Sequence, residues 1–388
     1  MREHDSFRRF ILAHPDEDAP RLLYADWLDA RGDPRAQFIR LQCALQRLPA
    51  EDPRAGEWQE QADALLKAHQ HEWVEPLRPL ISGWHFHRGF IDHVLIETRQ
   101  FLLNAEALFQ LAPVRHIQLL DIGGHTQQVA ESPYLDRLDA LTIFASHSGD
   151  ALARALATSP HLRQLKELNL GRNRISDSGV AAIAASRALS GLNSLDLTEN
   201  ELGEPAAHYI AASTTLSQLG TLNLNHNAVG CDGAMALFDS TRLSRLFTLK
   251  IGFNHINLFL PLGEAPVLRK LRTLDLSGNN LDGAGIAPLL ESPNIRGLHT
   301  LNLNSNILGD HGVGRIADAA NLAGLRTLLL EDNRITDAGV RLLAASPHLA
   351  RLTKLKLTNN AIGDAGIQAL QAAPFLQRQS RRVSTAIS

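Results

Sequence analysis

The same spaced pattern of leucines recurs eight times from residue 165 onward in this chain of 388 residues. Each copy reads Leu, two variable residues, Leu, one variable residue, Leu or Ile, two variable residues and Asn. Successive asparagines lie 27 residues apart, except for one interval of 25; they are Asn173, Asn200, Asn227, Asn254, Asn279, Asn306, Asn333 and Asn360. So regular a period predicts a solenoid, in which each copy forms one coil that packs against its neighbours.

One copy, residues 325–347, shows how a coil is expected to fold. Leu328 and Leu330 alternate with variable residues as in a short strand. Asp337 follows at a position typical of a helix N-cap, and apolar residues come after it at helical spacing. Pro347 ends this helix, because the residue before a proline is biased away from helical geometry. Each coil is therefore predicted to contain a strand followed by a helix.

The repeated asparagine has a physical role that leucine could not fill. Its amide both donates and accepts hydrogen bonds, so a buried copy can satisfy backbone groups of neighbouring coils. Parallel strands stack about 4.8 Å apart, whereas helices with their side chains need about 10 Å. The strands must therefore line the concave side, and eight of them give a wall on the order of 35 to 40 Å long.

These features resemble the leucine-rich repeats of the ribonuclease-inhibitor-like class, over residues 165–376. The resemblance implies an α/β leucine-rich repeat solenoid: a curved horseshoe with a parallel β-sheet on the concave face and helices on the convex face. Shorter, degenerate copies are predicted in residues 81–164, which gives ten or eleven coils in all. Phe375 and Leu376 are predicted to cover the last coil, and residues 377–388 form a flexible tail.

Residues 1–80 are predicted to form a helical N-terminal cap, because a solenoid exposes an apolar end unless another element covers it. Asp18 is the expected N-cap of a helix with Leu22, Leu23, Trp27 and Leu28 on its apolar side. The string PDEDAPRLLYADWLDARGDPRAQFIRLQ, residues 15–42, is similar to the repeat-companion domain, a segment that precedes repeats in bacterial paralogue families. The resemblance implies a bacterial protein with a cap ahead of its repeats, and it supplies no biochemical activity that can be carried over to this chain.

Composition restricts the classes of function. The 38 basic and 41 acidic residues give a net charge of −3, which argues against nucleic acid as a partner. Cys43 and Cys231 are the two cysteines, so no disulfide framework is expected, and a reducing, cytoplasmic location fits. The sequence shows neither a signal peptide nor a membrane-spanning segment.

No constellation of residues predicts an enzyme. Five histidines, including His85, His87 and His93, fall within 25 residues, but their spacing does not specify a third zinc ligand. A polar seam between cap and coils explains them better, so neither a metal nor a cofactor is predicted. Neither cysteine has a charged setting that would activate it, and glycine-rich phosphate loops are absent from the sequence.

The candidate binding site is the concave wall, where side chains alternate with buried leucines. The strand register predicts a polar, mostly neutral surface with five stacked threonines, which strand propensity alone could also explain. The candidate partner-binding residues on this surface are Asn223, Asn225, Lys250, Phe253, Asp275, Asn302, Asn304, Leu329, Glu331 and Lys356.

The coil after Asn254 is irregular: it is two residues short and lacks the usual start of a helix. Phe247, Phe253 and Phe259 are predicted to cluster around it. Such a coil can reflect sequence drift, or its aromatic patch, extending to Pro261, can anchor a partner. The sequence does not choose between the wall and this coil.

Three hypotheses about function follow. The first is a non-enzymatic scaffold that binds a protein partner through the concave face. The second is a regulator of a small GTPase, because leucine-rich repeat solenoids of similar period include GTPase-activating proteins. The third is a member of a paralogue set whose partner differs from copy to copy. Self-association through the C-terminal end of the solenoid is an additional hypothesis.

Overall fold

The computed structural model describes residues 2–49, 52–259, 262 and 265–373, and the chain divides into two compact units, residues 1–146 and 147–388. The domain boundaries predicted at residues 80 and 164 lie inside these units and stay predictions. The predicted end cover of Phe375 and Leu376 and the tail at 377–388 lie outside the described residues.

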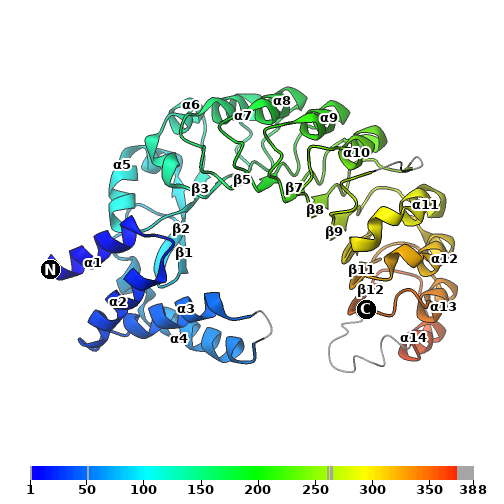
Figure 1. The fold of residues 1–388 in the computed structure, drawn as a ribbon, viewed down its shortest axis with the longest axis horizontal. Coiled ribbons are helices and arrows are strands. Elements are labelled where there is room, and N and C mark those ends of the chain that lie inside the picture. The colour runs from blue at the N-terminus through cyan, green and yellow to red at the C-terminus, as the bar shows by residue number, and fades with distance from the viewer. Residues whose placement is uncertain (1, 50–51, 260–261, 263–264, 374–388) are drawn as a thin grey trace. The chain divides into compact units, whose positions relative to one another are not determined.

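The first unit begins with four helices and continues with strands that alternate with further helices (Figure 1). Strands β1 and β2 form an antiparallel hairpin, and β2, β3 and β4 pair in parallel in chain order. The elements are α1 (Arg2–Ala13), α2 (Asp18–Asp29), α3 (Arg35–Arg47), α4 (Arg54–Val74), β1 (Gly83–His87), β2 (Phe90–Glu97), α5 (Thr98–Leu111), β3 (His116–Leu120), α6 (Thr126–Ala130), the 3-10 helix η1 (Pro133–Arg137) and β4 (Ala140–Ile143).

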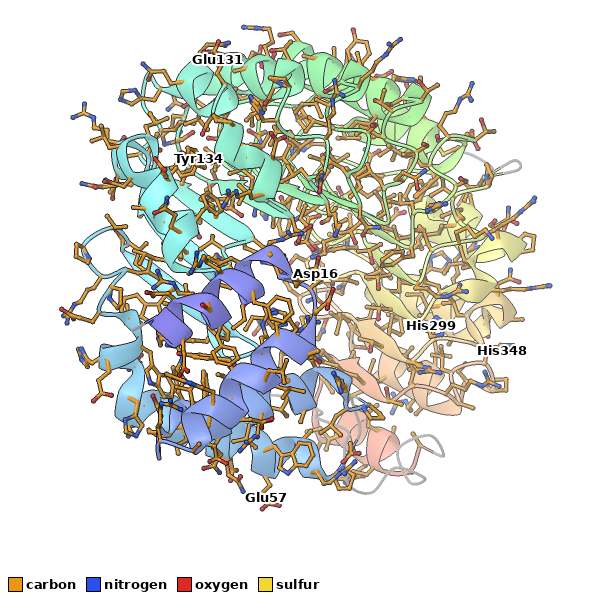
Figure 2. All side chains as sticks on the ribbon, turned by 60° about the vertical axis from the view of Figure 1, so that its left-hand side comes forward. Asp16, Glu57, Glu131, Tyr134, His299 and His348 are labelled. Carbon is orange, nitrogen blue, oxygen red and sulfur yellow. The ribbon has the colours of Figure 1, made fainter. Side chains whose placement is uncertain are left out.

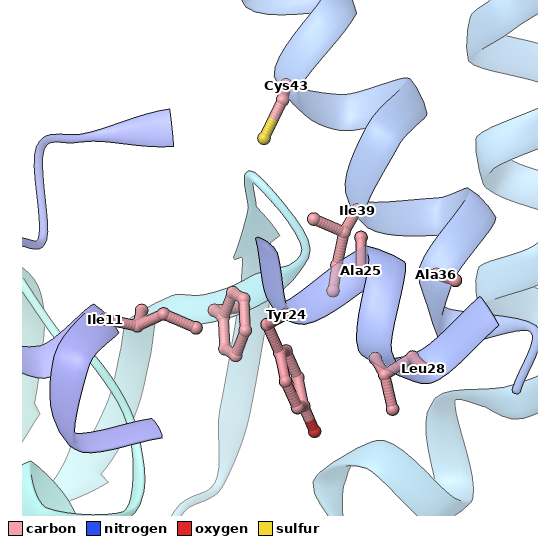
Figure 3. Packing of buried hydrophobic residues seen from close by; sticks show 8 residues of the cluster. Ile11, Tyr24, Ala25, Leu28, Ala36, Ile39 and Cys43 are labelled. Atoms are coloured by element: carbon pink, nitrogen blue, oxygen red, sulfur yellow. The ribbon is translucent and has the colours of Figure 1, made fainter. Parts of the chain in front are cut away.

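The N-terminal helices pack around a buried apolar cluster (Figure 3). Tyr24 and Leu28 of α2 meet Ile39 of α3, whereas Leu23 is 53% exposed, so its predicted place on the apolar side is wrong. The buried side of α2 also contains Arg21, whose Nη1 donates to the Glu17 carbonyl over 2.7 Å. Because a charged residue lies within the buried stripe of α2, the apolar periodicity of this helix could not be recognised from the sequence.

Asp18 does not cap helix α2, contrary to the prediction. The helix already begins at Asp18, and Glu17, at the N-cap position, makes no capping bond with its side chain. Asp18 instead forms ion pairs with Arg47, at 2.6 Å, and Arg88, at 3.4 Å. Its carboxylate therefore ties the start of α2 to the end of α3 and to the β1–β2 turn.

The second unit repeats one strand and one helix per coil, apart from one coil. The elements are α7 (Gly149–Thr158), β5 (Glu167–Asn169), α8 (Asp177–Ala185), β6 (Ser194–Asp196), α9 (Glu204–Ala212), β7 (Thr221–Asn223), α10 (Gly230–Phe238), β8 (Thr248–Lys250), β9 (Thr273–Asp275), α11 (Gly283–Glu291), η2 (Pro293–Gly297), β10 (Thr300–Asn302), α12 (Gly309–Asp318), η3 (Ala320–Leu322), β11 (Thr327–Leu329), α13 (Asp337–Ala345), β12 (Lys354–Lys356) and α14 (Asp364–Gln371). Among the described residues, the parallel strands are β2, β3 and β4 in the first unit and β5 to β12 in the second. The expected total of ten or eleven coils stays a prediction.

Strands β5 to β12 pair in parallel in chain order, with equivalent residues of each coil opposite one another. The central leucine of every strand, such as Leu249 and Leu301, is buried. Within the second unit the strands run along the inner side and the helices along the outer side (Figure 1). The predicted α/β solenoid is confirmed.

The helices of the second unit are capped partly by residues of the preceding coil. Thr336, not Asp337 as predicted, is the N-cap of α13, and its hydroxyl accepts from the Ala338 N–H. Asp337 reaches the following coil, where its Oδ1 accepts from the N–H groups of Gly363 at 2.7 Å and Gly366 at 3.1 Å. The aspartate that recurs in the sequence therefore joins two coils.

Asp310 occupies the equivalent position one coil earlier. Its Oδ1 accepts from the N–H groups of Thr336, at 2.8 Å, and Gly339, at 3.0 Å, and its Oδ2 accepts from the Thr336 hydroxyl. Burial alone would raise the pKa of Asp310, but these hydrogen bonds to the ionised form outweigh it and the pKa is lowered.

The coil between β8 and β9 contains no helix among its described residues, in keeping with its irregular sequence. Phe259 is 1% exposed and packs on Phe238, with ring centroids 5.6 Å apart. The prediction that it joins an exposed aromatic patch is therefore wrong, because its ring is buried against Phe238 of α10. Pro261 lies outside the described residues.

Candidate partner-binding surface

The repeated asparagines of the second unit are largely buried and link consecutive coils. In Asn227, Oδ1 accepts from the N–H groups of Asn200 and Leu202, both at 3.1 Å. Its Nδ2 donates to the carbonyls of Leu197, at 3.0 Å, and Leu224, at 2.9 Å. Asn173, Asn200, Asn254, Asn279, Asn306, Asn333 and Asn360 also donate through Nδ2 to backbone carbonyls. These residues hold the coils together and are not available to a partner.

The concave side of the second unit carries two positions per strand, on either side of the buried leucine. At the first position Thr221, Thr248, Thr273, Thr300 and Thr327 stand opposite one another on neighbouring strands. At the second position lie Asn223, Lys250, Asp275, Asn302, Leu329 and Lys356. Stacking places these candidates about 4.8 Å apart from strand to strand.

Asn223, Asp275 and Asn302 have a local structural role at this second position. The Oδ1 atom of each accepts from the N–H group two residues later, at 3.1, 3.0 and 3.1 Å. Asn223 also donates to Asp196 over 2.8 Å. Their side chains therefore shape the turn that ends each strand, which leaves them less hydrogen-bonding capacity for a partner.

The candidates that follow the strands also form hydrogen bonds with residues of other coils; they are Asn225, Asn304 and Glu331. Asn225 accepts from the Gly252 N–H over 2.7 Å and donates to Asp275 over 3.2 Å. Asn304 accepts from the Glu331 N–H over 2.9 Å and donates to its carboxylate over 2.8 Å.

Glu331 has two further partners on the next coil. It accepts from the Thr358 hydroxyl and lies 3.8 Å from the Lys356 ammonium group. Much of the polar wall is therefore satisfied internally, so these groups would have to give up a partner to bind another molecule.

Lys250 and Leu329 differ from these residues. Lys250 is half-buried between Asn223 and Asp275 on the neighbouring strands, and its ammonium group forms no hydrogen bond or ion pair with a described residue. Leu329 is a half-buried apolar side chain between Asn302 and Lys356. These two groups can contact a partner without breaking a bond within the chain.

Phe253 presents an aromatic ring beside this wall. It has a φ of 56° and is 40% exposed. One face of its ring stacks on His226, with centroids 4.2 Å apart and an interplanar angle of 8°. Beside the ring lies Gly278, where a Cβ atom would come within 2.3 Å of the ring. The ring is therefore held in place before any partner arrives.

Sequence reasoning missed His226 and Gly278, although the signal was present. Both precede an asparagine of the repeat, as Phe253 does, and the residues at this position adopt left-handed φ values from 51° to 62°. A position that repeats once per coil forms a row along the solenoid. Neighbours of Phe253 in that row could have been identified by counting one period in each direction.

Comparison with known proteins agrees with this geometry. The sequence model of the family described as leucine-rich repeat matches residues 161–184, 219–238, 267–290, 325–344 and 348–370. All five segments lie in the second unit. The second unit carries leucine-rich repeats.

Two further comparisons add little to the repeat assignment. No curated protein matches the sequence. Among solved structures, a crystal structure of an internalin from Listeria monocytogenes covers 76% of this chain and 87% of its own, with 19% identity and a TM-score of 0.38. Within the described residues, none of the helices combines the length and apolarity that a membrane crossing requires.

The histidines that precede the repeats lie side by side on three strands. Ring centroids are 5.2 Å apart for His85 and His93, and 5.9 Å apart for His93 and His116. Burial, followed by the neighbouring His85 and His116, lowers the pKa of His93. A bulge follows His85, and His87 bonds to Asp92 over 3.2 Å. In the part of the chain described, no three His, Cys, Asp or Glu side chains are arranged to hold a metal ion.

The two cysteines are expected to differ in reactivity. Cys43 is 2% exposed, and burial, with a contribution from Asp18, raises the pKa of its thiol to about 12. Cys231, at the start of α10 in the repeats, is partly exposed, and its thiol donates to Asn257 over 3.4 Å.

We expect Ellman's reagent to modify Cys231 in the native protein and both thiols in urea. Equal rates for both thiols in the native protein would show that the Cys43 site is open.

Proposed function

We propose that this protein is a non-enzymatic scaffold that binds a protein partner through the concave face of its leucine-rich repeats. Repeat solenoids commonly present an extended concave surface to a partner. The observation that carries the proposal is the contrast within the wall: most polar groups bond to one another, whereas Lys250 and Leu329 do not, and Phe253 is prearranged beside them. A few well-placed side chains carry most of the binding energy of a protein interface.

The partner is expected to present an acceptor to Lys250 and an apolar group to Phe253. Lys250 and Phe253 belong to one coil, and Leu329 lies three strands away, about 14 Å along the wall. A folded domain or a helix can contact both places at once. Asn223, Asn225, Asp275, Asn302, Asn304, Glu331 and Lys356 then define the shape of the surface between and around them.

The remaining assignments belong to the same proposal. We assign the repeats to the ribonuclease-inhibitor-like class from their 27-residue period, and residues 1–80 to a cap that resembles the repeat-companion domain. Both assignments fit a cytoplasmic bacterial protein.

Regulation of a small GTPase is the alternative function, and acceleration of GTP hydrolysis by the purified chain would favour it. Self-association through the C-terminal end is tested by sedimentation at high concentration.

A pull-down from native lysate tests the concave face. We expect the Lys250→Glu and Phe253→Asp double variant to lose a protein that the unaltered chain captures, with at least a tenfold drop in recovery, because a repulsive charge and a polar group replace the two anchors. The matched control is the Lys67→Glu and Phe10→Asp double variant, which makes the same changes at exposed positions of the first unit. Equal recovery by all three proteins, with unchanged circular dichroism, would contradict the proposal.

A further inference from the structure

Charge is distributed unequally between the two ends of the strands in the second unit. Eight four-residue segments precede these strands, and none contains an acidic residue, whereas six of them contain Arg or Lys; the segments are 163–166, 190–193, 217–220, 244–247, 269–272, 296–299, 323–326 and 350–353, and the two without Arg or Lys are 190–193 and 217–220. The corresponding turns after the strands contain both signs, for example Arg172, which pairs with Glu199 over 2.6 Å. The net charge of the whole chain is near zero and therefore gives no indication that basic residues are concentrated at one end of the strands.

Most of this charge lies in five consecutive coils, those of β8 to β12. We name the exposed side chains there the basic strip: Arg245, Arg269, Lys270, Arg272, Arg296, Arg326 and Arg351. Backbone hydrogen bonds run from Arg326 to His299 over 2.9 Å and from His299 to Arg272 over 2.8 Å, so these three residues stand on adjacent coils. His299, labelled in Figure 2, lies between the two arginines.

Contacts between coils hold several of these guanidinium groups in place. Nε of Arg296 donates to Asn321 over 3.0 Å, and Nη1 of Arg272 donates to the Gly297 carbonyl over 2.9 Å. Arg245, Arg326 and Arg351 form no ion pair with a described acidic side chain. An oriented guanidinium without an anionic neighbour is suited to bidentate binding of an oxyanion.

We propose that the basic strip binds an extended acidic segment of a protein. Five coils span about 20 Å at strand spacing, which matches about six residues of extended polypeptide. Alternating carboxylates of such a segment can reach guanidinium groups on successive coils. The surface is separate from the Lys250 and Phe253 site, and the proposal does not depend on that site.

Acidic side chains on both sides limit the width of the strip and favour a peptide over broader polyanions. Asp239, Glu291 and Asp318 lie at the helix ends, and Asp275 and Glu331 lie on the concave side. A nucleic acid duplex or an anionic membrane covers a broader surface than one extended strand and would also face these carboxylates, whose repulsion acts over a screening length of about 8 to 10 Å. Proteins that bind single-stranded nucleic acid typically combine basic groups with a series of aromatic platforms, and Phe247 is the one exposed Phe, Tyr or Trp side chain in the described segments that precede these strands.

Fluorescence anisotropy with a labelled eight-residue polyglutamate peptide tests the proposal on the full-length protein. We expect saturable binding that weakens as NaCl is raised. The triple variant Arg245→Glu, Arg326→Glu and Arg351→Glu should weaken it at least tenfold, since these side chains make no hydrogen bond within the described protein that the change would break. The matched control is Arg174→Glu, Arg334→Glu and Arg341→Glu, which alters net charge equally elsewhere in the second unit and should change affinity less than twofold.

Several outcomes would overturn the inference. Equal weakening in both triple variants would show that binding follows net charge alone. Tighter binding of an oligothymidylate, or of vesicles containing anionic lipid, with loss in the first triple variant, would assign the strip to nucleic acid or membrane instead. If the first triple variant does not fold, the neutral Arg245→Gln, Arg326→Gln and Arg351→Gln variant replaces it, with at least a threefold loss expected. Loss of peptide binding with an intact lysate pull-down would separate this inference from the proposed function.

Discussion

Replacing Asn306 with alanine is expected to lower the free energy of unfolding of the second unit by about 3 to 5 kcal/mol. Asn306 is 4% exposed, and its Oδ1 accepts from the N–H groups of Asn279, at 3.1 Å, and Leu281, at 2.9 Å. Its Nδ2 donates to the carbonyls of Leu276 and Leu303, both at 3.0 Å. Alanine leaves three of these groups, the N–H groups of Asn279 and Leu281 and the Leu276 carbonyl, buried without their partner, whereas the Leu303 carbonyl still accepts from Nδ2 of Asn333. Each unpaired group costs about 1 to 3 kcal/mol unless water replaces the amide.

Urea denaturation followed by circular dichroism measures this effect. The matched control is Asn193→Ala, because Asn193 is exposed just before β6 and its side chain makes no hydrogen bond with a described residue. Its free energy of unfolding should change by less than about 0.5 kcal/mol. If both variants unfolded at the same urea concentration, the buried asparagines would not be what joins the coils.

The second large effect is expected in the first unit, where Gly89→Ala should lower the free energy of unfolding by about 2 to 4 kcal/mol. Gly89 has a φ of 83°, in the left-handed region that side chains disfavour. An added Cβ atom would lie 2.2 Å from Cγ1 and 2.9 Å from Cα of Ile39. The helix backbone of α3 cannot yield as a flexible side chain would, so the β1–β2 turn must move away from it.

Gly32→Ala separates the two causes of that loss. Gly32 also has a left-handed φ, 70°, but no atom lies within 4 Å of an added Cβ. Its replacement should cost about 1 kcal/mol from backbone conformation alone. Thermal unfolding monitored by near-ultraviolet circular dichroism compares the two variants. Equal losses would show that the contact between Gly89 and Ile39 contributes nothing.

The solenoid could be predicted because its constraints repeat once per coil. A leucine in the centre of each strand and an asparagine in each turn follow directly from the packing of one coil on the next. The N-terminal helices were harder to predict, because the buried side of α2 includes Arg21, whose guanidinium lies 5.7 Å from the centroid of the Phe90 ring. A buried charged residue that packs against a ring distant in the sequence breaks the apolar pattern on which prediction depends.

Contacts between coils were also beyond sequence reasoning. The position of Asp337 suggested a cap for its own helix, yet its carboxylate accepts from Gly363 and Gly366 of the next one. Such a bond depends on the offset between stacked coils, which the repeat length alone does not define. Phe259 was misplaced for a similar reason, since its burial depends on a contact with Phe238 of the preceding helix that sequence spacing does not define.

The candidate site was predicted as a list of positions on one face, and the structure shows how those positions differ. Sequence register brought Lys250 and Asn304 onto the same wall, but it could not show that Asn304 bonds to Glu331 whereas Lys250 has no partner among the described residues. The stack of Phe253 on His226 depends on two residues with left-handed φ values in adjacent coils. Side-chain pairing, rather than register, therefore determines which residues of the wall can bind.

Photo-crosslinking tests most directly the proposal that a protein partner binds to the concave face. A photoreactive phenylalanine analogue in place of Phe253, on the concave side, is compared with the same analogue in place of Tyr209, which is 46% exposed on helix α9 of the outer side. Irradiation in native lysate should produce one specific protein adduct from the Phe253 position and none from the Tyr209 position. An adduct that forms only from the Tyr209 position would contradict binding through the concave face.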